Sequence, residues 1–193
     1  MIFRKLKGAF NAGLFLYRNM SRAAKMKKSP IISEGGITYR GVIKNELAEA
    51  EFLYRFFHEG KGFSWDKKII YRMFSEQMII VAVNEENYSQ KFVGINVYYF
   101  NRRDILEGTV HEGFIGVLPE AGGRGIATNL GLHAKKHFAD NGFKGLSSRV
   151  SLNNEASLIS RKKIGYEPVE AYFDSVMNED RYYMICELGN ACD

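Results

Sequence analysis

Cysteine is scarce in this chain of 193 residues, which contains only Cys186 and Cys192. Two cysteines near one end of the chain form neither a disulfide framework nor the spaced ligand set of a zinc site. We therefore expect free thiols, a reducing compartment such as the cytoplasm, and no metal.

Long apolar runs are also missing, although 46% of the residues are hydrophobic. A membrane-spanning helix requires roughly 18 to 20 uninterrupted apolar residues, and no segment approaches that length. The stretch Ala9–Tyr17 is short for a secretory signal, and it contains Asn11. The length and composition predict one globular domain with an appendage rather than two domains.

Acidic side chains are absent from residues 1–29, which hold eight basic ones. All 22 acidic residues follow, so the net charge of +5 arises in this head and not in the body. A nucleic-acid-binding domain would carry basic residues across its folded body, and no helix-turn-helix, RNA-recognition or zinc-finger pattern is present. Nucleic acid is therefore not an expected partner.

Apolar residues in the head recur at the spacing of one helical face. They are Phe3, Leu6, Phe10, Leu14 and Tyr17. We expect a basic amphipathic helix within residues 1–30 and a folded domain in residues 31–193. The apolar stripe suits a membrane interface with anionic lipid, which would place a cytoplasmic protein at the inner face of a membrane. Packing of the stripe on the domain, or on a second copy in a homodimer, is the alternative.

The body alternates strand patterns with helix patterns. Strands are predicted at residues 37–42, 78–83, 92–100, 113–118, 144–152, 172–177 and 182–188, and helices at 45–58, 65–77, 125–141 and 155–164. In the first of these helices, Phe52 and Phe56 are expected to face the core. The order of elements predicts an α/β fold with a mixed sheet flanked by helices.

A glycine-rich turn connects a predicted strand to the next helix. From Val117 its sequence is Val-Leu-Pro-Glu-Ala-Gly-Gly-Arg-Gly-Ile-Ala-Thr. Gly122, Gly123 and Gly125 allow the backbone to approach a ligand closely and to point successive N–H groups at it. The helix dipole favours a phosphate or pyrophosphate there, and Arg124 adds a cation. The spacing matches neither a Rossmann nor a P-loop motif, and a tight turn without a ligand is the alternative.

Three segments together resemble the GNAT superfamily of acyl-CoA-dependent N-acetyltransferases. The segment Val117–Leu130 is similar to the acyl-CoA signature of that family, in which a strand is followed by Arg/Gln-x-x-Gly-x-Gly/Ala and a helix. Val150–Ala156 resembles its strand-to-helix segment with an Asn, and Lys163–Tyr166 resembles its Gly-Phe/Tyr ending. The resemblance covers about residues 37–188 and implies a mostly antiparallel central sheet flanked by helices.

The resemblance also implies how acetyl-CoA, or another acyl-CoA, would bind. Backbone groups around Val117 would bind the pantetheine arm, while the turn and the helix start would hold the pyrophosphate. The implied cofactor contacts are Val117, Gly122, Gly123, Arg124, Gly125, Ile126, Ala127, Thr128 and Asn154. Because the thioester is already activated, the protein has to position a neutral amine and remove its proton.

Two positions depart from the family pattern. Gly122 stands where members usually carry Arg or Gln, which removes one side-chain contact. Arg161, seven residues after Asn154, stands where many members carry a Tyr that protonates the leaving thiolate. An Arg side chain, with a pKa above about 12, cannot act as that acid at neutral pH, but its charge could stabilise a thiolate. Ser160, Tyr166 or a water remain as proton donors.

His111 is the candidate general base. It lies six residues before Val117, which puts both side chains on the same face of a regular strand, and members of the family often carry a Glu or His there. An imidazole with a pKa near 6.5 suits proton removal at neutral pH. If the register is shifted by one residue, Glu112 takes this role. The alternative for His111 is a solvated residue at the strand end.

Acceptor recognition in the family usually involves the first loop and helices and the C-terminal strands. The corresponding candidates are His58, Glu59, Trp65 and Asp66, whose carboxylates could hold an amine. The sequence thus predicts acetyl or short-acyl transfer from acyl-CoA to a primary amine of a small molecule. A non-catalytic acyl-CoA-binding or scaffolding module and a transferase acting on a protein amine are the alternatives.

Overall fold

The computed structural model describes residues 2–85 and 91–189, and the side chains of residues 2–7 are outside this description. The strands are β1 (Ile32–Glu34), β2 (Ile37–Gly41), β3 (Ile79–Val83), β4 (Phe92–Tyr99), β5 (Thr109–Val117), β6 (Gly145–Ser151), β7 (Tyr166–Asp174) and β8 (Glu179–Glu187). The α-helices are α1 (Ile2–Ala23), α2 (Leu47–Phe57), α3 (Trp65–Met78), α4 (Arg102–Glu107), α5 (Ile126–Ala139) and α6 (Glu155–Ile164), with short 3-10 turns at Lys44–Glu46 and Pro119–Ala121.

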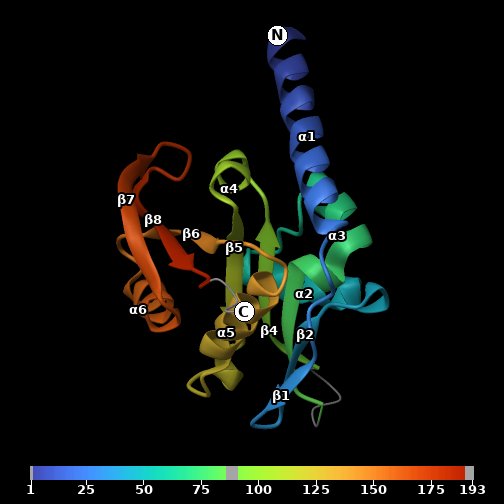
Figure 1. The fold of residues 1–193 in the computed structure, drawn as a ribbon, viewed down its shortest axis with the longest axis vertical. Coiled ribbons are helices and arrows are strands. Elements are labelled where there is room, and N and C mark those ends of the chain that lie inside the picture. Colours follow the sequence, from blue (N-terminus) through green and yellow to red (C-terminus); the bar gives the residue numbers. More distant parts are fainter. Residues whose placement is uncertain (1, 86–90, 190–193) are drawn as a thin grey trace.

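The described strands form one sheet in the order β1-β2-β3-β4-β5-β6-β8-β7 (Figure 1). Every neighbouring pair is antiparallel except β5 and β6. The predicted mixed, mostly antiparallel α/β sheet is therefore confirmed. Two of the three segments that carry the family resemblance, Val117–Leu130 and Val150–Ala156, begin at the ends of the two strands of this parallel pair.

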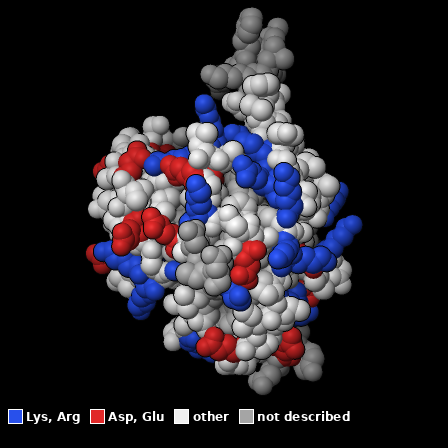
Figure 2. Space-filling model, in the orientation of Figure 1, with Lys and Arg blue, Asp and Glu red and all other residues white. Residues whose placement is uncertain are grey.

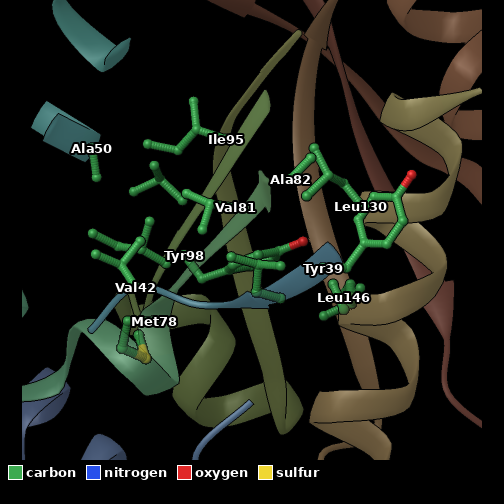
Figure 3. Packing of buried hydrophobic residues seen from close by; sticks show 14 of the residues in the cluster. Tyr39, Val42, Ala50, Met78, Val81, Ala82, Ile95, Tyr98, Leu130 and Leu146 are labelled. Atoms are coloured by element: carbon green, nitrogen blue, oxygen red, sulfur yellow. The ribbon is translucent and has the colours of Figure 1, made fainter. Parts of the chain in front are cut away.

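Helices cover both faces of the sheet. A side chain at Gly94 in β4 would meet Leu130 of α5, whereas Phe114 in β5, on the opposite face, packs on Phe57 of α2. Figure 3 shows part of the resulting core, with Leu130 on one side of the strands and Ala50 of α2 on the other. The strands are thus held between two packed layers of helices.

The expected orientation of the first body helix is wrong in part. Phe52 is 75% exposed and Phe56 is also exposed, while Ala50 and Leu53 are buried. Positions 50, 53 and 57 follow the three-to-four-residue helical spacing toward the sheet, which turns 52 and 56 outward. The large apolar side chains of this helix therefore do not all mark its buried face.

Several elements differ from the predicted ranges. The sequence patterns did not predict β1 or α4, and β5 begins at Thr109 instead of residue 113. The last two strands also begin earlier, at Tyr166 and Glu179. Residues 86–90, between β3 and β4, lie outside the described residues, as does Cys192, while Cys186 is buried with a free thiol.

Candidate active site

The parallel strands β5 and β6 separate halfway along their length. They pair only from Thr109 with Gly145 to Glu112 with Ser148. Beyond this point, in the part of the chain that the structure describes, Gly113–Val117 pairs with β4 alone, and its side chains are exposed or half-buried. Since the backbone groups on the free edge of β5 need partners, this edge can bind an extended ligand as a further strand would.

The free edge leads directly into the glycine-rich turn. After β5 the chain forms the 3-10 turn Pro119–Ala121 and then reaches Gly123 and Gly125, which have φ of 76° and 75°. Both values lie in the left-handed region that favours glycine. An added Cβ at either position would meet nothing within 4 Å, so the turn is open on the side where a ligand would lie.

Helix α5 starts at this turn and offers unpaired donors to it. Gly125 is the N-cap and provides no side-chain cap, and Asn129 N–H donates to the Gly125 carbonyl. The N–H groups before Asn129 have no partner within an α-helix. Together with the dipole of this 14-residue helix, they form a cradle that fits a pyrophosphate.

The side chains around this cradle have distinct places. Ile126 is buried in the core, whereas Arg124 is exposed and makes only a 3.5 Å contact with the Gly35 carbonyl. Gly122 has φ of −63°, and an added Cβ would lie 3.0 Å from the Pro119 carbonyl oxygen. A glycine at this position therefore accommodates the tight 3-10 turn, which gives a structural reason for the missing Arg or Gln.

The remaining predicted cofactor residues lie along the same path. Val117 is half-buried at the end of the free edge, and Ala127 and Thr128 belong to the first turn of α5. Asn154 caps α6, because its side chain accepts a hydrogen bond from Ser157 N–H at 3.0 Å. Its contact with a cofactor stays a prediction.

A β-bulge at Gly113 alters the expected alternation in β5. Phe114 pairs with Val97 of β4 but Glu112 pairs with Tyr98, so Gly113 is an extra residue. Val117 consequently shares the α5 face of the sheet with Glu112, and the expectation that His111 and Val117 share a face is wrong. His111 instead lies on the opposite face.

His111 is buried and held by a hydrogen-bonded chain, so the alternative of a solvated strand-end residue is also wrong. Its Nδ1 is 2.7 Å from Ser147 Oγ, and that hydroxyl donates to Asp104 Oδ1 at 2.6 Å. Because Ser147 gives its one proton to Asp104, it accepts from Nδ1–H of His111. The lone pair of the imidazole therefore resides on Nε2, and Nε2 makes no hydrogen bond within the described part of the chain.

Asp104 is a site residue that the sequence reasoning missed. It lies in α4, where Asn101 and Asp104 form a reciprocal capping box, and it also accepts a hydrogen bond from Thr109. Burial raises the pKa of Asp104, and hydrogen bonds from Ser147 and the Asn101 backbone oppose this. The sequence signal that could have located it is Asn101-x-x-Asp104, a helix N-terminus just before β5.

The electrostatic environment of His111 is unfavourable to protonation. Burial, followed by the charges of Arg149, Lys67 and Arg181, lowers its pKa to about 3. The expected pKa near 6.5 is therefore wrong, because the side chain is buried beside cations and not solvated. His111 is neutral at pH 7.

Glu112 belongs to a buried polar cluster on the α5 and α6 face. Its carboxylate accepts hydrogen bonds from Asn96 at 2.7 Å and from Tyr166 at 2.9 Å, and it lies 3.1 Å from Nε of Arg161 in an ion pair. Burial acts to lower the pKa of Arg161, but the charge of Glu112 together with Tyr166 and Tyr98 outweighs burial and raises this pKa. Arg161 is thus charged, and its Nη1 has no hydrogen-bond partner among the described residues.

The predicted acceptor residues are only partly brought together. His58 stacks on Tyr54 with a ring separation of 3.8 Å and packs edge-on against Phe114, which lies on the separated part of β5. Trp65 is exposed at the start of α3, next to Asp66, which accepts from its own backbone neighbour Lys67 N–H. Glu59 is exposed in the loop and pairs only loosely with a nearby lysine at 3.8 Å.

Metal ligands do not gather at this site. Within residues 2–85 and 91–189, no group of three or more His, Cys, Asp or Glu side chains is arranged to hold a metal ion.

The fold and the sequence together define the class of protein. The sequence matches the Acetyltransferase (GNAT) family over residues 45–166, and the chain belongs to this family. No protein of curated function matches it.

Solved structures share the fold at low sequence identity. A chain of the NatC complex bound to Gag peptide and CoA aligns with a TM-score of 0.68 and 16% identity, over 79% of this chain and 98% of that one. The structure of yncA, a putative acetyltransferase from Salmonella typhimurium with its cofactor acetyl-CoA, aligns with a TM-score of 0.64 and 15% identity, over 82% of this chain and 98% of that one. A variant of a spermidine N-acetyltransferase from Vibrio cholerae aligns with a TM-score of 0.59 and 13% identity, over 80% of this chain and 95% of that one.

The buried, neutral histidines should make the protein sensitive to acid. The pKa of His111 is lowered to about 3 and that of His133 to about 4, whereas an unfolded chain has a His pKa of about 6.5. Below that value the unfolded chain binds more protons, so the free energy of unfolding falls as the pH is lowered and is unaffected above it. Urea unfolding of the His111→Gln variant between about pH 6.5 and about pH 4 should show a slope smaller by up to about 1.4 kcal/mol per pH unit. An unchanged slope would contradict the burial of a neutral His111.

The Glu112–Arg161 ion pair should be tested by a double-mutant cycle. Arg161→Met leaves the Glu112 carboxylate buried without its cation and should lower the free energy of unfolding by about 3 to 5 kcal/mol. Arg161→Met combined with Glu112→Gln should recover much of that loss, as measured by chemical denaturation. If the losses in free energy of unfolding measured for Arg161→Met and for Glu112→Gln add up to the loss of the double variant, these residues do not interact.

Proposed function

We propose that the protein transfers an acetyl or other short acyl group from acyl-CoA to a primary amine of a small molecule. The observation that carries this proposal is the continuity of the free β5 edge with the phosphate cradle. A pyrophosphate at the start of α5 places a linked extended arm along Val117–Gly113. The arm then ends at the bulge, where His111 and Glu112 leave the strand on opposite faces.

The chain's own groups would bind the acyl donor at both ends of that path. The thioester supplies an activated carbonyl when it is bound. The N–H groups of Gly123–Thr128 and the charge of Arg124 would hold the phosphates, and the backbone of Val117 would orient the arm. Positioning of the acyl carbon against the amine is then the main contribution of the protein.

His111 is our proposed acceptor of the amine proton. Nδ1–H is engaged by Ser147, so Nε2 is the nitrogen that is able to accept. The low pKa of about 3 comes from burial and from nearby cations, and the negative charges of a bound acyl-CoA would offset those cations. Asp104 acts through Ser147 as a positioning residue, because it fixes the tautomer of the imidazole.

Arg161 is our proposed stabiliser of the leaving thiolate. Glu112 balances its charge at 3.1 Å, but Nη1 remains a buried donor without a partner in the described chain. A hydrogen bond from Nη1 to sulfur would satisfy this donor as negative charge develops. Tyr166, which donates to Glu112, keeps its proton because burial raises its pKa well above 10.

The acceptor would reach His111 from the face that carries α2 and α3. His58 and Phe114 form an aromatic wall on that face, and Trp65 and Asp66 lie at the start of α3 beyond it. An aromatic wall orients an acceptor by stacking, and the Asp66 carboxylate would hold its amine. Glu59 would serve as a second, outer carboxylate.

A peptide α-amine is the second candidate acceptor. By TM-score, the fold resembles a chain of a complex bound to a peptide and CoA (0.68) at least as closely as it resembles a spermidine N-acetyltransferase (0.59). Release of free coenzyme A thiol should therefore be followed with polyamines, amino sugars and short peptides in parallel. Turnover with peptides alone would overturn the small-molecule proposal, and coenzyme A binding without turnover on any amine would indicate a non-catalytic module.

The role of His111 predicts a loss of turnover that is separate from a loss of folding. His111→Gln should lower kcat by about 10² or more, because a positioned base contributes roughly 10² to 10⁴, while the affinity for coenzyme A stays near that of the unaltered chain. His133→Gln is the matched control, since His133 is also a buried histidine with a serine partner, at 2.7 Å from Ser29. Equal kcat values for the two variants would remove His111 from the mechanism.

The cradle predicts a specific contribution of Arg124 to cofactor affinity. Arg124→Ala should raise the dissociation constant of coenzyme A about three- to tenfold, because a partly solvated cation–phosphate contact contributes about 1 kcal/mol. Arg72→Ala, at an exposed position in α3, is the control and should leave the constant unchanged. Calorimetric titration distinguishes these outcomes, and an unaltered constant for Arg124→Ala would place the phosphates elsewhere.

A further inference from the structure

Helix α1 is fixed to the body through its C-terminal half. Phe15 packs on Tyr99 at a ring separation of 5.8 Å, and Asn19 exchanges two hydrogen bonds with the backbone of Phe100 at 2.7 and 2.9 Å. Ala23 is fully buried. The helix therefore has a defined orientation, and its N-terminal part projects beyond the body (Figure 1).

The apolar stripe recognised in the sequence is not the face that packs on the body. Phe10 is 67% exposed, Leu14 is 40% exposed and Tyr17 is 71% exposed. At 100° per residue these positions lie on the side of the helix away from Asn19 and Ala23. The alternative that the described part of the stripe packs on its own domain is therefore wrong. Phe3 and Leu6 continue the stripe by spacing, but their side chains are outside the described residues.

Basic side chains gather where the C-terminal end of α1 meets the body. Arg22 and Lys25 line a pocket of about 410 Å³ together with Leu106 and Lys144. Leu106 also borders a second pocket of about 390 Å³, whose other lining residues are Asn101, Arg102, Arg103 and Arg149. Figure 2 shows Lys and Arg side chains gathered on the body below the projecting helix. Of these cations, Arg103 is paired with Glu107 and Glu170.

We propose that the stripe of Phe10, Leu14 and Tyr17 docks on the surface of a lipid bilayer that contains anionic lipids. The exposed side chains would enter the boundary between head groups and acyl chains, and the adjoining cations would meet lipid phosphates. The first acidic residue of the chain is Glu34, so acidic side chains along α1 do not oppose this contact. No described helix is both long and apolar enough to span a bilayer, and the contact is interfacial.

Charge favours a lipid surface over a second copy of the chain. A dimer formed through the stripe would bring two sets of basic side chains, Arg18, Arg22 and Lys25 of each copy, close to one another. Like charges at an interface are repulsive, whereas anionic head groups neutralise the same cations. The homodimer is thus an alternative that the experiment has to exclude.

The proposal is tested by co-sedimentation of the full chain with vesicles. Wild-type protein should bind vesicles of phosphatidylcholine mixed with phosphatidylserine and should bind pure phosphatidylcholine much more weakly. Phe10→Gln combined with Tyr17→Gln should weaken binding to the mixed vesicles about tenfold or more, because two exposed aromatic contacts are lost. Arg22→Gln combined with Lys25→Gln should weaken binding to the mixed vesicles while leaving the weak binding to phosphatidylcholine unchanged.

A matched control uses aromatic residues that are exposed elsewhere. Phe52→Gln combined with Phe173→Gln removes two exposed rings from α2 and β7 and should bind vesicles as the unaltered chain does. Equal binding by the Phe10/Tyr17 variant and the unaltered chain would overturn the proposal. A dimer in sedimentation equilibrium that the Phe10/Tyr17 substitutions convert to a monomer, without vesicle binding by either form, would also overturn it. Circular dichroism reports folding in every variant independently of any ligand, so a failure here is distinguishable from failure of the proposed transfer.

Discussion

The separation of β5 from β6 is the constraint on which the rest of the site depends. The two strands pair as far as Glu112 and Ser148, and from there the backbone of β5 has one free edge. A sheet edge inside a domain carries unpaired polar groups, so this edge needs a partner that is not a strand. The glycine-rich turn begins where the edge ends, and an extended, phosphate-bearing ligand satisfies both features at once.

The bulge at Gly113 determines how the chemistry is divided between the faces of the sheet. His111 and Glu112 are consecutive strand residues and so lie on opposite faces, and the extra residue Gly113 places Glu112 instead of His111 on the face of Val117. His111 joins Ser147 and Asp104 on one face, and Glu112 joins Arg161 on the other. A neutral imidazole and a balanced ion pair therefore flank the same short stretch of backbone. Burial keeps the two groups distinct, because neither can exchange its partners for water.

Local signals in the sequence located the turn, but the arrangement of the site depends on long-range pairing. Gly122, Gly123 and Gly125 were identified because glycines allow the backbone to approach a ligand closely, and in the structure Gly123 and Gly125 have positive φ values. The bulge arises from the pairing of β4 with β5, which no spacing within β5 reveals. Asp104 reaches Ser147 across 43 positions of the chain, so its role depends on the fold. Phe52 and Phe56 show that apolar character alone does not define the buried face of a short helix.

Helix α1 also shows that an apolar pattern in the sequence does not by itself identify the buried face of a helix. This helix of 22 residues carries apolar side chains on two faces, and the spacing in the sequence indicated the face with the larger side chains. Packing selects the other face, because Asn19 satisfies the buried backbone N–H and carbonyl groups of Phe100, which follows β4, while Ala23 allows close approach. Phe10, Leu14 and Tyr17 are then left exposed among the described residues. Exposed apolar side chains that lie together on one helix face are typical of interaction surfaces, and this observation is the basis of the proposed contact with a lipid surface.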